Sequence, residues 1–417
     1  MNQTSQSKES SQSTIAILIG QLNLGGAERQ AKLVFEEMRR ISETYLIIKD
    51  SKIRSNTGGV YKEIKKRYLT GVIKLDEIQL VNYRKNTQPR AEIRKHFRPL
   101  RILIKEQRKL FKNIIIVLKL RNTLKNQNIK TVYAFLPSSL VLISAVKLTS
   151  FRLFKKLTII MCVRSSTDQI NGIQLISYKL IVKVFPDFYI TNSNFLREEL
   201  INQYKISSNK IQIVRNKIDP KIFHLLNNPP PEKKKSKIKI ITVGNAKKVK
   251  NNEKILRIME VLEDEGHRFH YSHIGETRFI QTEKYKNSSQ INFLGPQTHL
   301  QTLKAIYESD IFINFSESEG SSNAVLEALC LGTTCVLSDI PSNRELAGSF
   351  GVFCNSDIDL MLAIKKLIKY DVNLKAEVKK RNKSARSSKY VRTYHYNLKS
   401  ESSYKKLTER FNSTQRY

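Results

Sequence analysis

One strand–turn–helix–strand pattern in the second half of the chain constrains its fold more than any other feature. Residues 311–315 form a short, mostly apolar run that is typical of a buried strand. Turn and N-cap residues interrupt this run at 317–323, an apolar helical run follows at 324–331, and Gly332 is placed to end the helix. A β-rich run at 333–337 then indicates a second strand. The segment is therefore predicted to be a βαβ unit whose turn lies at the carboxyl end of a parallel strand, where open α/β sheets bind ligands.

The turn of this unit combines groups that suit a phosphate with groups that suit a sugar. Free backbone N–H groups at a helix N-terminus form a site for anions, and a glycine lets a ligand approach the backbone closely. A carboxylate beside such a site is unfavourable unless it accepts hydrogen bonds from hydroxyl groups, which sugars and ribose supply. Two glutamates flank the helix start with seven residues between them, and we expect them to face one ligand from two sides. The candidate binding residues are Glu319, Gly320, Ser322, Asn323, Ala324, Val325 and Glu327.

The complete string is more specific than the glutamate pair, because most pairs at this spacing are solvated surface carboxylates. Residues 319–328, followed by Gly332 and a valine-bearing strand, closely resemble the glutamate signature of the glycosyl transferases group 1 family. The resemblance implies an α/β chain with the GT-B fold, in which two doubly wound Rossmann-like domains face a central cleft. It also implies an enzyme that transfers a sugar with retention of its anomeric configuration.

The length of 417 residues fits two domains. Residues 1–13 are rich in Ser and Gln and are expected to be disordered. Residues 14–210 are expected to form an acceptor-binding Rossmann-like domain. Residues 211–385 are expected to form a donor-binding Rossmann-like domain with an extended linker at 227–237. The tail at 386–417 resembles the terminal helix that, in the family, packs back on the first domain.

Charge and cysteine content limit the partners and the compartment. A formal net charge of +36 requires an acidic partner, and nucleic acid and an anionic membrane are the two serious candidates. A composition rich in Lys, Asn and Ile explains part of the excess, but it does not by itself concentrate basic residues in one stretch. No apolar run approaches the ~20 residues of a membrane span. The four cysteines form neither a CxxC pair nor a metal-ligand cluster, so we expect reduced, buried thiols and a cytoplasmic protein.

Two features of the first domain are candidates for contact with a ligand. Gly25 and Gly26 lie between the first predicted strand and a helix; alone they indicate only a tight turn, but they resemble the Gly-Gly-Ala-Glu loop of the family. That resemblance implies that they face the donor or acceptor across the cleft. Arg164 follows a predicted strand, where it meets either a phosphate or a surface carboxylate.

The second domain opens with a strand and a loop that resemble the donor-phosphate loop of the family. Gly244 and Lys250 match the pattern, whereas Asn245 stands where an arginine is usual. This substitution removes a charged contact with the diphosphate, for which Lys247 or Lys248 is a replacement. A loop lysine is usually solvated, so the assignment of Lys250 to phosphate binding depends on the glutamate string.

A basic segment at 84–125 mixes Arg and Lys with Ile, Leu and Phe, and it predicts an amphipathic helix after Pro99. Each basic side chain near an anionic leaflet contributes ~1 kcal/mol, so a few of them suffice for reversible attachment. The alternative is a solvated helix face with a core stripe on its other side.

The family resemblance assigns roles to individual residues. Glu327 is expected to accept hydrogen bonds from the ribose hydroxyls and Glu319 from the donor sugar. Lys250 and the helix N–H groups are expected to neutralise the leaving diphosphate, which makes Glu319 and Lys250 the candidate catalytic residues. No metal and no cofactor other than the nucleotide-sugar substrate is expected. Departures from the family pattern occur at Phe135, where many relatives carry a histidine, and at Lys217, where glycine is usual.

The predicted function is transfer of a sugar, with UDP-sugar as the favoured donor, to a lipid-linked or saccharide acceptor. The expected process is assembly of a bacterial surface polysaccharide or lipopolysaccharide at the inner face of the cytoplasmic membrane, with peripheral attachment and no nucleic acid. A catalytically inactive GT-B scaffold is one alternative, which the substitutions at Asn245, Phe135 and Lys217 keep open. A basic nucleic-acid-binding protein is the other, although it leaves Glu319 and Glu327 unexplained.

Overall fold

The computed structural model describes residues 14–21, 25–49, 72–75, 98–166, 173–227, 237–369 and 391. Several predictions from the sequence lie outside these residues. They are the disordered start at 1–13, most of the linker at 227–237, the basic residues of 84–97, and the terminal helix at 386–417 apart from residue 391.

The first domain contains a seven-stranded parallel sheet with the order β3-β2-β1-β4-β5-β6-β7. Alternate residues of a strand point to opposite faces, and in β1 they enter two separate cores, with Ile17 on one side and Leu18 on the other. Helix α1 covers the face of Ile17, and α3 to α6 cover the face of Leu18. The strands are β1 (Ile15–Ile19), β2 (Thr44–Ile48), β3 (Val72–Lys74), β4 (Thr131–Phe135), β5 (Thr158–Val163), β6 (Phe188–Thr191) and β7 (Ile211–Ile213). The helices are α1 (Gly26–Met38), α3 (Arg98–Asn126), α4 (Pro137–Thr149), α5 (Ile173–Val184), α6 (Asn194–Tyr204) and η2 (Ser208–Lys210).

The second domain repeats this architecture with a six-stranded parallel sheet of order β10-β9-β8-β11-β12-β13. Helices α7, α9, α10 and α11 pack on one face of the sheet, and α8 and α12 pack on the other. The strands are β8 (Ile238–Val243), β9 (Phe269–Ile274), β10 (Ile291–Gly295), β11 (Ile311–Asn314), β12 (Thr334–Ser338) and β13 (Gly351–Cys354). The helices are α7 (Pro220–Asn227), η3 (Lys248–Lys250), α8 (Asn252–Asp264), η4 (Thr282–Tyr285), α9 (His299–Glu308), α10 (Asn323–Leu331), α11 (Pro341–Ala347), η5 (Gly348–Phe350) and α12 (Asp357–Lys369).

The predicted βαβ unit is confirmed as β11, α10 and β12. Ser322 is the N-cap of α10, and its side chain accepts a hydrogen bond from the backbone of Val325. Gly332 ends the helix in the left-handed conformation with a φ of 72°, as its position in the sequence predicts. Strand β8 lies next to β11, and the chain reverses its direction of winding between them, so the turn before α10 lies at the topological switch point of the sheet.

The predicted domain boundary between residues 210 and 211 is wrong in detail. Strand β7 (Ile211–Ile213) pairs in parallel with β6 and completes the first sheet, so the first domain extends at least to Ile213. The alternating apolar pattern of Ile211, Gln212 and Ile213 forms one more edge strand of the first sheet before the chain crosses to the second domain.

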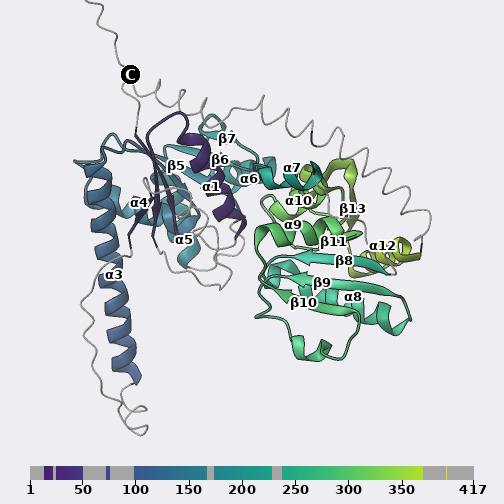
Figure 1. Cartoon of the computed structure of the whole chain (residues 1–417). Coiled ribbons are helices and arrows are strands. Elements are labelled where there is room, and N and C mark those ends of the chain that lie inside the picture. The colour runs from purple at the N-terminus through teal and green to yellow at the C-terminus, as the bar shows by residue number, and fades with distance from the viewer. Residues whose placement is uncertain are drawn as a thin grey trace, which may run out of the picture.

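The two domains lie side by side (Figure 1). Polar contacts join them directly. The carboxylate of Glu345, in α11, accepts hydrogen bonds from the backbone N–H groups of Asn194 and Phe195 at 2.8 and 3.2 Å. Arg215 Nη1 donates to the same carboxylate at 2.9 Å. Because an anion at a helix N-terminus is stabilised by the helix dipole, Glu345 fixes α6 of the first domain against α11 of the second.

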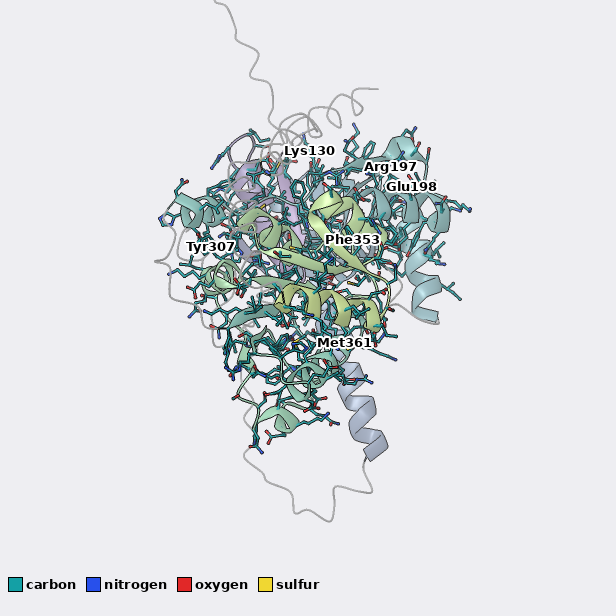
Figure 2. The ribbon with its side chains drawn as sticks, turned by 90° about the vertical axis from the view of Figure 1, so that its right-hand side faces the viewer. Lys130, Arg197, Glu198, Tyr307, Phe353 and Met361 are labelled. Atoms are coloured by element: carbon teal, nitrogen blue, oxygen red, sulfur yellow. The ribbon has the colours of Figure 1, made fainter. Side chains whose placement is uncertain are left out.

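The part of the basic segment that is described begins at Arg98 and continues as one long helix, α3, to Asn126. The expected helix is confirmed, and its N-terminal end projects beyond the packed domains in Figure 1 and Figure 2. Among the helices of the described residues, none has the length and apolar character that a membrane crossing requires. All four cysteines are free and buried, as expected.

Candidate active site between the two domains

The loop after β8 brings Lys250 toward the turn before α10. Gly244 begins this loop with a φ of +145°, and Asn245 Oδ1 accepts a hydrogen bond from the backbone of Glu276 at 3.0 Å. Lys250 lies in η3, which two contacts hold to the segment after β11. The Glu317 N–H donates to Val249 O at 2.9 Å, and Asn251 Nδ2 donates to Phe315 O at 3.2 Å.

Lys250 and Glu319 form an ion pair, so the structure brings the two candidate catalytic residues together. Glu319 Oε1 also accepts hydrogen bonds from Ser316 Oγ at 2.9 Å and from Asn314 Nδ2 at 3.3 Å. These contacts hold Glu319 at the carboxyl end of β11 with its side chain largely buried. A diphosphate that binds Lys250 therefore competes with Glu319 for the same ammonium group.

Gly320 permits a close approach between the two domains. A Cβ added to it would lie 2.6 Å from the backbone oxygen of Arg164, so a larger residue would push the loop away from the first domain. Arg164 Nη1 donates to Asn216 Oδ1 at 3.0 Å, and its guanidinium lies 5.2 Å from the centre of the Phe135 ring. Asn216 Nδ2 in turn donates to Ser321 O at 3.0 Å. Arg164 thus braces the junction between the domains, and its contact with a phosphate stays a prediction.

The N-terminus of α10 faces the double-glycine loop of the first domain. A Cβ on Gly26 would lie 2.4 Å from Asn323 Nδ2, which explains why glycine suits this position. Gln30, one turn later in α1, donates to Asn323 Oδ1 and to Lys217 O, each at 3.0 Å, and accepts from the Lys217 N–H at 2.8 Å. The side chain of Asn323 is therefore part of the domain interface. The N–H of Val325 is already bonded to Ser322 Oγ, although at a long 3.5 Å.

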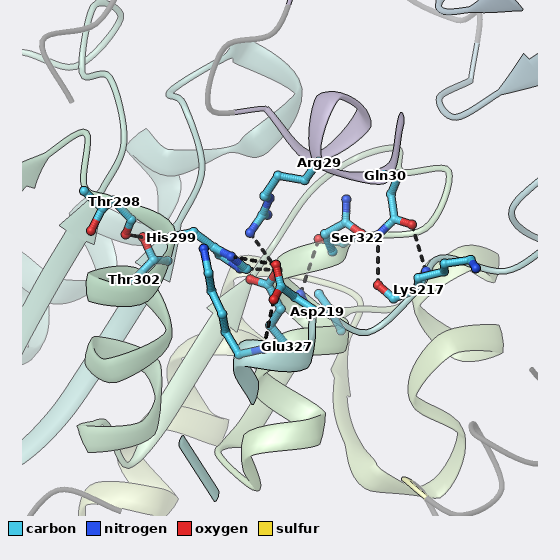
Figure 3. A network of polar contacts seen from close by, with 12 residues as sticks. Arg29, Gln30, Lys217, Asp219, Thr298, His299, Thr302, Ser322 and Glu327 are labelled. Carbon is cyan, nitrogen blue, oxygen red and sulfur yellow. Dashed lines mark hydrogen bonds and ion pairs between the residues drawn. The ribbon is translucent and has the colours of Figure 1, made fainter. Parts of the chain in front are cut away.

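Glu327 is buried and lies at the centre of a group of charges that both domains contribute (Figure 3). Arg29 Nη1, from α1, lies 2.8 Å from Glu327 Oε1. His299 Nε2, at the first residue of α9, lies 3.1 Å from the same oxygen. The other ring nitrogen, His299 Nδ1, lies 3.3 Å from Asp219 Oδ2.

The pKa values of these groups follow from burial and from their partners. Burial raises the pKa of Glu327, but the Arg29 guanidinium and the His299 ring outweigh it and hold the pKa below its usual value. Burial also raises the pKa of Asp219, but the hydrogen bonds from His299 and from the Lys221 N–H outweigh it and lower that pKa to about 2. Burial lowers the pKa of His299, whereas its hydrogen bonds to the two carboxylates outweigh this and raise it above the ordinary value. Both carboxylates are therefore ionised at neutral pH.

One carboxylate oxygen of Glu327 lacks a hydrogen-bond partner among the described residues. Among the described residues, Glu327 Oε2 is buried and has no hydrogen-bond partner, and the same holds for Arg29 Nε. A buried carboxylate oxygen without a partner is costly, and native proteins usually satisfy such atoms. A hydroxyl group of a ligand would supply the hydrogen bond that this oxygen lacks.

Sequence reasoning missed three residues of this site: Arg29, Asp219 and His299. Arg29 directly follows the Gly-Gly-Ala-Glu loop and Asp219 lies two residues after Lys217, so both are close in sequence to predicted site residues. His299 carried no signal other than its position after Thr298, which caps α9 through a capping box with Gln301. Within the described residues, no cluster of three or more His, Cys, Asp or Glu side chains is arranged to hold a metal ion.

The C-terminal part of the chain matches the model of a known family. No curated protein matches the sequence. Residues 226–386 match the model of the family described as glycosyl transferases group 1. The chain therefore contains a glycosyl transferases group 1 domain at residues 226–386. The matched residues include the Lys250 loop, Glu319 and Glu327, and the chain is a glycosyltransferase.

Solved structures share the fold of this glycosyltransferase over almost its whole length. Anabaena HepE, in complex with UDP-glucose, is 13% identical with a TM-score of 0.64, and the match covers 90% of this chain and 93% of HepE. Sucrose-phosphate synthase from Thermosynechococcus elongatus is 12% identical with a TM-score of 0.64, covering 97% of this chain and 98% of the synthase. A mutant of S. aureus TarM, in complex with fondaparinux, alpha-GlcNAc-glycerol and UDP, is 12% identical with a TM-score of 0.64, covering 96% and 99%. At such identities the likeness shows the fold alone, which is the GT-B fold.

Proposed function

We propose that this glycosyltransferase transfers a sugar from a UDP-sugar to a lipid-linked or saccharide acceptor, with retention of the anomeric configuration. The observation that carries the proposal is the convergence of Lys250, Glu319, the α10 N-terminus and Glu327 at the interface of the two domains. The presence of UDP or UDP-glucose in the solved HepE and TarM structures supports UDP as the nucleotide.

The proposed chemistry is stabilisation of the leaving diphosphate. Negative charge grows on the diphosphate as the glycosidic bond breaks, and a fixed ammonium and helix dipole there stabilise the transition state more than the bound substrate. Lys250 supplies the ammonium group, and the backbone N–H groups of Asn323 and Ala324 supply the positive end of the helix dipole. The proposed reaction uses no divalent metal. Gly244 and Asn245 line the approach of the diphosphate, and Gly25 and Gly26 close the site from the first domain.

The carboxylates hold the hydroxyl groups of the donor. Glu327 Oε2 is a buried acceptor without a partner among the described residues, which suits a ribose that offers two hydroxyl donors. Glu319 accepts a hydrogen bond from the donor sugar once the diphosphate competes for Lys250. No carboxylate is assigned as a nucleophile.

The acceptor is proposed to reach the first domain from an anionic membrane surface, at the inner face of the cytoplasmic membrane. The basic segment at 84–125, which includes α3, supplies positive charge. The outer face of α5 adds exposed apolar side chains at helical spacing, Ile176, Leu180 and Val184, with Lys179 and Lys183 between them. Basic and apolar side chains on one helix face favour an interfacial position on a bilayer. The corresponding process is assembly of a bacterial surface polysaccharide or lipopolysaccharide.

The proposal is tested by release of nucleoside diphosphate from a panel of UDP- and GDP-sugars, with extracted bacterial lipids or oligosaccharides as acceptors. We expect turnover of a UDP-sugar by the wild type and a loss of about a hundredfold or more in Lys250→Ala, because one preorganised transition-state contact disappears. Lys254→Ala, which removes a lysine on the surface of α8 paired with Asp357, is the control and should keep full turnover. Equal turnover by Lys250→Ala and wild type, or no release from any donor by folded protein, would contradict the proposal.

A further inference from the structure

Four ionisable side chains from four separate segments meet beside α10. Asp219 precedes α7, His299 begins α9, Glu327 lies in α10, and Arg29 comes from α1 of the other domain. The family signature accounts for Glu327 alone. Arg29 and His299 both contact Glu327 Oε1, and Asp219 contacts the other ring nitrogen of His299.

The charge state of these four side chains follows from which of their atoms can donate a hydrogen bond. An ionised carboxylate only accepts hydrogen bonds, and His299 has one carboxylate at each ring nitrogen. Both nitrogens must therefore donate, which requires the doubly protonated imidazolium. The group then holds two anions and two cations, and each charge has an opposite partner.

This arrangement restricts Glu327 to one orientation. Oε1 receives both Arg29 and His299, whereas Oε2 is buried without a partner among the described residues. The His299 ring is itself fixed at its far nitrogen by Asp219 and at its backbone by the capping box of α9. A ligand hydroxyl thus meets an ionised carboxylate whose orientation is already fixed.

We propose that His299, held by Asp219, is a positioning residue that aims Glu327 Oε2 at the ribose of the donor nucleotide and makes nucleotide binding sensitive to pH. The inference rests on the proposed function and extends it to a residue that the glutamate signature does not contain. His299 does not touch the ribose in this proposal; it acts through Glu327.

The direction of the pH dependence follows from the groups that face His299. These are Asp219 and Glu327, which favour its charged form, and Arg29, which opposes it, while Lys221 lies near Asp219. The hydrogen bonds to Asp219 and Glu327 raise the pKa of His299, so the ring keeps its charge to a higher pH than an ordinary histidine and loses its proton as the pH rises further. A neutral ring presents a lone pair to one of the two carboxylates, and nucleotide affinity falls.

The test is calorimetric titration with UDP between about pH 6 and 9, a range that spans the ordinary and a raised histidine pKa. We expect the affinity of the wild type to fall with rising pH. We expect His299→Asn to bind UDP about tenfold more weakly at the low end and without this pH dependence, because one charge-assisted hydrogen bond is lost. His299→Gln keeps an amide donor for Glu327, so it should recover part of the affinity and remain insensitive to pH.

Two further variants separate positioning from folding. His270→Asn removes another imidazole of the same domain, in β9, and should retain the wild-type pH profile. Asp219→Asn removes one anion from His299, so the fall in affinity should begin at a lower pH than in the wild type. A wild-type profile and affinity in His299→Asn and His299→Gln would overturn the inference and leave the proposed function standing. Absence of UDP binding by folded wild type at every pH would instead overturn the proposed function, and the inference with it.

Discussion

Glu319→Gln is expected to slow sugar transfer strongly, while UDP binds to the variant as tightly as to the wild type or more tightly. In the structure the carboxylate of Glu319 pairs with Lys250, so a diphosphate must compete with it. The amide has no charge, which leaves Lys250 available to the nucleotide and removes a negative charge near the phosphates. The same amide is a weaker acceptor for the sugar hydroxyl, so turnover should fall by about a hundredfold to a thousandfold. Turnover assays and UDP titration measure the two effects separately.

The matched control for this variant is Glu317→Gln, two residues earlier in the same loop. The side chain of Glu317 is exposed, and only its backbone N–H contributes a contact to the Lys250 loop. It should change neither turnover nor UDP affinity. A Glu319→Gln enzyme with wild-type turnover, or with UDP binding lost in parallel with turnover, would contradict the role assigned to Glu319.

Glu327→Ala is expected to lower both nucleotide affinity and stability. The truncation leaves Arg29 and the His299 imidazolium buried without their shared anion. Loss of one partner from a buried ion pair typically costs about 3–5 kcal/mol of unfolding free energy. Loss of a charged acceptor for the ribose should weaken UDP binding by about tenfold to a hundredfold. Urea unfolding followed by circular dichroism and calorimetry measure these two quantities.

Glu253→Gln on the exposed first turn of α8 is the control, and it should be close to the wild type in both measurements. If Glu327→Ala were destabilised yet bound UDP with wild-type affinity, the ribose role of Glu327 would be wrong. Its role would then be limited to holding the two domains together.

The features that the sequence predicts correctly are those encoded by contiguous residues. The β11–α10–β12 unit needed only an apolar run, a capping serine and a stop glycine, all within about thirty positions, which is a local pattern. The position of its turn at the carboxyl end of a parallel strand followed from the βαβ connectivity. The Lys250 loop was found because its strand end, Gly244 and Lys250 resemble the donor-phosphate loop of the family.

The remaining parts of the site depend on tertiary placement. His299 and Asp219 are far from Glu327 in sequence, and a histidine at the first position of a helix is most often a surface residue. Only the packing of α7, α9 and α10 on one face of the sheet brings these side chains together. Arg29 additionally depends on how one domain meets the other, which no periodicity in either domain specifies. For the same reason the strand at Ile211–Ile213 was assigned to the wrong domain, because edge pairing is decided by the neighbouring strand.

The most direct test of the account is calorimetric titration of the purified protein with UDP and with GDP, beside Lys250→Ala. The account predicts saturable binding of UDP at one site per chain, weaker binding of GDP, and a clear loss of UDP affinity in the variant. Failure of both nucleotides to bind the folded wild type would contradict a donor site between the two domains. It would favour a GT-B scaffold that has lost its donor.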